Sequence, residues 1–110
     1  MRIQVQARGF SVTEALRDKA ERRLRFALGS LAGQIRSVNV LLDDQNGPRG
    51  GVDKRCKLRV MLDTQPAVVI EHLESDVYVA IDRASERASR TLARRLQRAG
   101  SLRRDASLSF

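Results

Sequence analysis

Two hydrophobic periodicities alternate along the chain, and their order constrains the fold more than any other feature. Four segments alternate apolar and polar side chains, as strands with one buried face do. These segments are residues 2–8, 37–42, 54–62 and 67–73. Two others repeat apolar residues every three or four positions, as one-sided helices do, and they are residues 11–29 and 75–98. The order β-α-β-β-β-α predicts an α+β two-layer sandwich, a four-stranded sheet with two helices on one face.

The connections between these segments predict how the strands pair. A helix joins the first two strands, so we expect them to be parallel, through a right-handed crossover. The last three strands follow one another without a helix, so we expect an antiparallel meander. Cys56 faces inward, and we expect a buried thiol in the core. Seven other apolar residues at inward positions are predicted to lie in the same core: Leu16, Leu24, Val40, Leu58, Val60, Ile81 and Leu92.

The ends of the helices and of the domain are predicted by local signals. Ser11 and Glu14 fit a capping box for the first helix, and Thr13 is the alternative N-cap. At 110 residues the chain has the length of one domain. We expect residues 1–99 to form the α+β domain and residues 100–110, which lack periodicity, to be a flexible C-terminal tail. A single cysteine and the lack of a signal-peptide pattern fit a cytoplasmic setting.

The charge balance points to a polyanionic partner. The chain has 21 Lys and Arg against 13 Asp and Glu, a net charge of +8, and all but three of the basic residues are arginine. Arginine suits bidentate contact with phosphate better than lysine does. We therefore expect nucleic acid as the first candidate partner and an anionic membrane as the second.

Five arginines lie four, three, four and four residues apart in the last helical segment, on one side of the helix and away from the sheet. They are Arg83, Arg87, Arg90, Arg94 and Arg98, in a row about 22 Å long. Arg22 and Arg25 lie opposite the apolar stripe of the first helix, with Arg23 and Lys19 beside them. Such charges are often only a solvated face. Few acids lie one turn away, so we favour phosphate binding and predict all eight arginines as RNA-binding residues.

Patterns that would indicate catalysis are missing from the sequence. His72 is the only histidine, and no Cys/His cluster has metal-ligand spacing. The glycine-rich loop within residues 43–53 lacks the Gly-Lys-Ser/Thr ending of a phosphate loop. We therefore expect no enzyme, no cofactor and no metal. None of the four aromatic residues lies on a predicted strand, so stacking of bases on the sheet is disfavoured.

Three segments carry a resemblance to a known family: residues 12–24, 38–42 and above all 75–96. The most specific element is the run Asp-x-Tyr-x-Ala-Ile-Asp at residues 76–82. In these segments the chain resembles the ribosome hibernation-promoting factors, the family that includes the ribosome-associated inhibitor. The resemblance covers residues 1 to about 98 and includes the predicted β-α-β-β-β-α order.

The resemblance implies a specific partner and mechanism. Family members bind the small (30S) ribosomal subunit and its ribosomal RNA between head and body. They occlude the tRNA and mRNA channel and repress translation under stress or in stationary phase. Basic positions of the family match Arg23, Arg87, Arg90 and Arg94 here. No role follows for a membrane or for a small-molecule substrate.

The resemblance leaves some features open. The loop at residues 43–53 does not match the family closely, which leaves its contacts open. The short promoting subtype fits best, and formation of 100S ribosome dimers would then involve a separate ribosome modulation factor. Two alternative functions remain: a general binder of structured RNA, and a protein-binding regulator of the sigma-factor modulation type.

Overall fold

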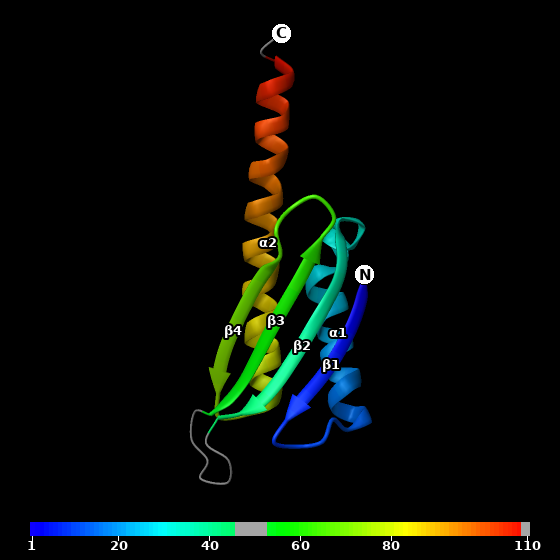
Figure 1. Ribbon diagram of the computed structural model, residues 1–110, viewed down its shortest axis with the longest axis vertical. Coiled ribbons are helices and arrows are strands. Elements are labelled where there is room, and N and C mark those ends of the chain that lie inside the picture. Colours follow the sequence, from blue (N-terminus) through cyan, green and yellow to red (C-terminus); the bar gives the residue numbers. More distant parts are fainter. Residues whose placement is uncertain (46–52, 109–110) are drawn as a thin grey trace.

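The computed structural model describes residues 1–45 and 53–108, with side chains up to residue 98. Its elements are β1 (Arg2–Arg8), α1 (Glu14–Leu28), the short 3-10 helix η1 (Gly29–Gln34), β2 (Ile35–Asp44), β3 (Lys54–Leu62), β4 (Val68–Glu74) and α2 (Val77–Leu108). Figure 1 shows two layers, with α1 and α2 side by side on one face of the sheet. The predicted α+β two-layer sandwich and its element order are confirmed.

The sheet has the strand order β1-β2-β3-β4. β1 runs parallel to β2, with Val5 opposite Val40, and α1 makes the crossover between them. β2, β3 and β4 form the expected antiparallel meander, in which Leu58 of β3 pairs with Val40 and with Ile70. β1 and β4 are the edge strands, so the central β2 and β3 carry the densest part of the core.

The core lies between the sheet and the two helices. All seven predicted core residues are buried, none more than 4% exposed. Cys56 is fully buried among them as a free thiol, and burial raises its pKa to about 12. Such a thiol stays protonated at neutral pH, so its position is that of a small core side chain.

A short polar side chain caps the N-terminus of each long helix. Thr13 is the N-cap of α1, because its Oγ1 accepts a hydrogen bond of 3.1 Å from the backbone N–H of Leu16. Asp76 does the same for α2, where Oδ1 accepts from the N–H of Tyr78 at 2.7 Å. Of the two predicted caps for α1, the structure therefore selects Thr13 over Ser11.

Replacing Thr13 with alanine is expected to lower the free energy of unfolding by about 1 kcal/mol, within a range of about 0.5–2, because an N–H at the helix start loses its partner. Urea unfolding followed by circular dichroism measures the change. Ser11→Ala is the matched control, since it removes the same hydroxyl two residues earlier. If Ser11→Ala proves the more costly substitution, the assignment of the cap is wrong.

Helix α2 is longer than the sequence predicts. Its backbone continues to Leu108, where an irregular tail was expected from residue 100. Figure 1 shows this part projecting past the sheet. Leu92 is the last fully buried side chain among those that the structure describes, and Arg95 donates to the carbonyl oxygen of Pro66 at 3.5 Å, where the helix leaves the sheet. Helix growth costs little once a helix exists, and leucine, arginine and alanine favour it, so α2 continues without an apolar stripe.

Candidate nucleic-acid interface

The five arginines of the α2 row are all exposed, on the side of the helix away from the core. Two of them have partners within the protein: Arg83 lies 3.7 Å from Glu86, and Arg87 donates to the carbonyl oxygen of Glu71 in β4 at 2.7 Å. The other three, Arg90, Arg94 and Arg98, have no carboxylate within 4.0 Å among the side chains that the structure describes. Their charges are available to a partner.

The three predicted arginines of α1 have different surroundings. Arg22 and Arg25 are exposed, as predicted. Arg23 is only 20% exposed and turns toward α2, where its Nε donates to Asp82 Oδ1 at 3.1 Å and its Nη2 to Glu86 Oε1 at 3.5 Å. The structure therefore gives Arg23 a role within the protein that the sequence did not predict.

Arg23 belongs to a row of ion pairs between α1 and α2, which we call the interhelical seam: Lys19, Arg23, Asp82 and Glu86. Lys19 Nζ lies 3.0 Å from Asp82 Oδ1, next to the contacts of Arg23. These side chains are about 20–43% exposed, so each pair adds on the order of 0–1 kcal/mol at most. The seam mainly fixes how the outer faces of the two helices lie relative to each other.

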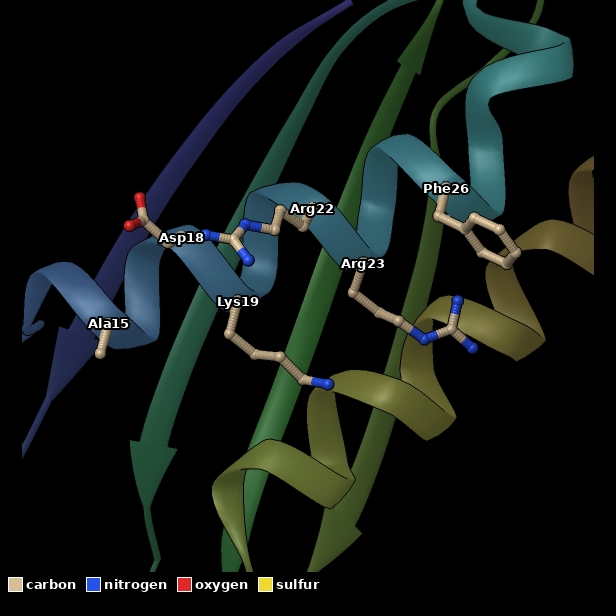
Figure 2. A pocket seen from close by; sticks show the side chains of 6 residues that line it. All are labelled: Ala15, Asp18, Lys19, Arg22, Arg23 and Phe26. Carbon is tan, nitrogen blue, oxygen red and sulfur yellow. The ribbon is translucent and has the colours of Figure 1, made fainter.

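Phe26 is a feature of this surface that the sequence left unassigned. It is 86% exposed, the most exposed large hydrophobic side chain among the residues that the structure describes. The guanidinium carbon of Arg23 lies over its ring, 5.9 Å from the centroid, which is cation–π geometry. In Figure 2, Arg23 and Phe26 project from the same side of α1 toward α2. The sequence signal was its position off the apolar stripe, three residues after Arg23.

Two open hollows share Arg23 and Phe26. The larger, of about 570 Å³, lies along α1 and is drawn in Figure 2; its lining is Ala15, Asp18, Lys19, Arg22, Arg23 and Phe26. The smaller, of about 330 Å³, lies between the helices; its lining is Arg23, Phe26, Ala27, Glu86, Ser89 and Arg90. The aromatic ring of Phe26 thus lines two hollows, each of which also has arginine side chains and one carboxylate in its lining.

Apart from the buried Cys56, the ionisable groups with shifted pKa values lie where β2 and β3 approach the loop between them. Burial acts to raise the pKa of Asp43, but hydrogen bonds from Arg55 and Gln45 outweigh it, so the pKa falls below its usual value. The hydrogen bond to Asp43 raises the pKa of Arg55. A hydrogen bond to Asp44 likewise raises the pKa of Lys54. These cations are already paired, so they are weaker candidates for binding phosphate than the α2 row.

The predicted loop at residues 43–53 is described only in part, since residues 46–52 and their contacts lie outside the described residues. Among the residues that the structure describes, no group of three or more His, Cys, Asp or Glu side chains is arranged to hold a metal ion. No helix within the same residues is both long and apolar enough to cross a bilayer.

Comparisons with known proteins concern the family and the fold of the chain. The family model described as "Sigma 54 modulation protein / S30EA ribosomal protein" matches residues 3–99. The fold is similar to a ribosomal subunit interface protein from Coxiella burnetii, with a TM-score of 0.77 and 18% identity, over 88% of this chain and 99% of that one. It is also similar to the N-terminal domain of Thermus thermophilus Protein Y, with a TM-score of 0.70 and 27% identity, over 86% and 98%. The search of curated proteins gave no match.

Proposed function

The chain belongs to the Sigma 54 modulation protein / S30EA ribosomal protein family, and from this premise we propose that it is a ribosome hibernation factor that binds the small ribosomal subunit through RNA phosphates. Two proteins of similar fold are a ribosomal subunit interface protein and the N-terminal domain of Protein Y. Family membership agrees with the resemblance in the sequence, which pointed to ribosome hibernation-promoting factors.

The observation that carries the proposal is the set of exposed arginines on the helical layer, most of which have no acidic partner among the described side chains. Arg90, Arg94 and Arg98 are its centre, and Arg83 and Arg87 extend it along α2. Arg22 and Arg25 add a second basic strip on α1, and Arg23 positions the two strips through the interhelical seam. Each arginine that contacts a phosphate releases counterions from the RNA, which supplies the binding free energy.

The mechanism that we propose is occlusion, without a chemical step. The packed sandwich exists before binding, so little conformational entropy is lost when it docks. Once held by ribosomal RNA in the cytoplasm, its volume excludes tRNA and messenger from the channel of the small subunit. Translation is then repressed for as long as the protein stays bound, as a cell under stress or in stationary phase requires.

A second candidate function is regulation of a sigma factor, because the matching family model carries both descriptions. A protein partner of that kind would be recognised without RNA. A general binder of structured RNA, the third possibility, would accept any duplex. The three proposed functions predict different sedimentation partners for the protein.

Sucrose-gradient sedimentation with purified small subunits, large subunits and a duplex RNA separates the three readings. We expect the protein to sediment with small subunits and to be released by nuclease and by high salt. With about five phosphates engaged, the logarithm of the binding constant should fall against the logarithm of salt concentration with a slope of about −3.5 to −4.5. Equal binding to the duplex, or a cellular complex that survives nuclease, would contradict the proposal.

A further inference from the structure

Packing of the fold does not explain Phe26. At 86% exposure its ring contributes little to the core, and a polar residue would serve the helix as well at this position. A single exposed hydrophobic residue is common on protein surfaces and needs no function. Its surroundings distinguish Phe26, because a cation, two hollows and free arginines gather around the ring.

The ring is partly oriented by the interhelical seam. Arg23, whose guanidinium lies over the ring at 5.9 Å, is itself held by Asp82 and Glu86 of α2. A cation on one face of an aromatic ring attracts it and leaves the other face open to solvent. One face of the Phe26 ring therefore contacts Arg23, and the other face is free to contact a partner.

The charged groups around the ring indicate what that partner carries. Arg22 lines one hollow and Arg90 the other, and neither has a carboxylate within 4.0 Å among the described side chains. Lys19 and Arg23 are neutralised by Asp82 and Glu86. One arginine without a carboxylate partner thus lines each of the two hollows that share the ring. A planar group flanked by two anions fits this arrangement. A nucleotide within a strand is such a group, because its base lies between two backbone phosphates.

We propose that Phe26 stacks on one unpaired base of small-subunit ribosomal RNA, while Arg22 and Arg90 bind the phosphates that flank this base. The base must be unpaired because a paired base offers no free face for an aromatic side chain. This inference rests on the proposed function. It adds a contact whose strength depends on the shape of the side chain at position 26 and not on its charge. A second copy of the chain is disfavoured, since both copies would bring a net charge of +8.

The test compares Phe26→Leu with Phe26→Trp in binding to purified small subunits at fixed salt. Leucine keeps an apolar side chain and a high helix propensity but lacks a flat ring, and tryptophan keeps the ring. We expect Phe26→Leu to weaken binding about 5- to 150-fold, the range found when one base stack is lost, and Phe26→Trp to keep wild-type affinity. The salt slope should not change, because no charge is removed.

Tyr78→Leu is the matched control, because Tyr78 is an exposed aromatic residue at the start of α2, outside both hollows. It should leave binding unchanged. A photoreactive benzoylphenylalanine at position 26 gives an independent readout, and we expect its crosslink to map to an unpaired nucleotide of the ribosomal RNA. A crosslink to a ribosomal protein instead would overturn the proposal.

The outcomes separate this inference from the proposed function. If wild-type protein does not bind small subunits, the proposed function is wrong and the stacking contact falls with it. If wild-type protein binds and Phe26→Leu binds equally well, the proposed function stands and only the stacking contact is wrong. If Phe26→Trp binds as weakly as Phe26→Leu, an aromatic ring at this position does not retain binding, and the stacking contact is wrong.

Discussion

Replacing Arg90, Arg94 and Arg98 with glutamine is expected to weaken binding to the small ribosomal subunit by about 100- to 500-fold at 0.1 M salt. Each phosphate contact contributes about 0.7–0.9 to the slope of log K against log salt. The loss of three contacts therefore lowers the binding constant at 0.1 M salt by this factor. The salt slope should become shallower by about 2–3 units for the same reason. Inhibition of translation in a purified system should fall in parallel.

The triple substitution should not harm the fold. The three side chains are exposed and have no carboxylate partner among the described residues, and glutamine has nearly the helix propensity of arginine. Removing like charges one turn apart relieves repulsion, so the free energy of unfolding should hold or rise slightly. A loss of binding with an unchanged urea midpoint therefore reports on the interface.

The matched control removes the same charge from the other face of the molecule. Arg2, Arg8 and Arg59 are exposed on β1 and β3, and their strand positions point away from the helices. Their replacement by glutamine should cost much less affinity. If the control loses as much binding as the α2 variant, net charge alone is responsible and the site assignment is wrong. If the α2 variant binds at wild-type affinity, the row is a solvated face.

Replacing Leu58 with alanine is expected to lower the free energy of unfolding by about 2–5 kcal/mol. Leu58 is fully buried on β3, between Val40 of β2 and Ile70 of β4. Its truncation removes apolar contacts and leaves a cavity in the densest part of the core, where neighbours on both sides limit relaxation. Urea unfolding measures the change.

Leu73→Ala makes the same chemical change on β4 at a residue that is 46% exposed, and it should cost well under half as much. A cost below about 0.5 kcal/mol for Leu58→Ala would mean that this strand faces the other way. Variants that remain folded should bind small subunits normally, since Leu58 lies far from the exposed arginines in the layered fold.

The fold was predictable because its determinants are local. Alternation in the strands and the stripe of α1 identify inward residues one by one, and the helical connection between β1 and β2 implies their parallel pairing. The end of α2 was not predictable from periodicity, because the helix continues after it has left the sheet and no apolar stripe marks its length.

The candidate site was predictable only as a set of basic residues. Arg22 and Arg23 are neighbours in the sequence, yet one is exposed and the other is held by acids of α2. Those acids lie 59 and 63 residues further along the chain, so only the packing of the two helices reveals the pairing. The same packing places Phe26 beside two hollows, which the pattern of α1 alone could not indicate.

The interhelical seam also shapes how the surface can tell one polyanion from another. Its two cations and two carboxylates cancel, so an electrically neutral strip separates the arginines of α1 from those of α2. Packed helices lie about 8–10 Å apart, which sets the spacing of the two positive tracks. A strand that runs along one track gains from the arginines of that track alone. A folded RNA that presents phosphates to both tracks at once gains from each, so shape is selected without any base being read.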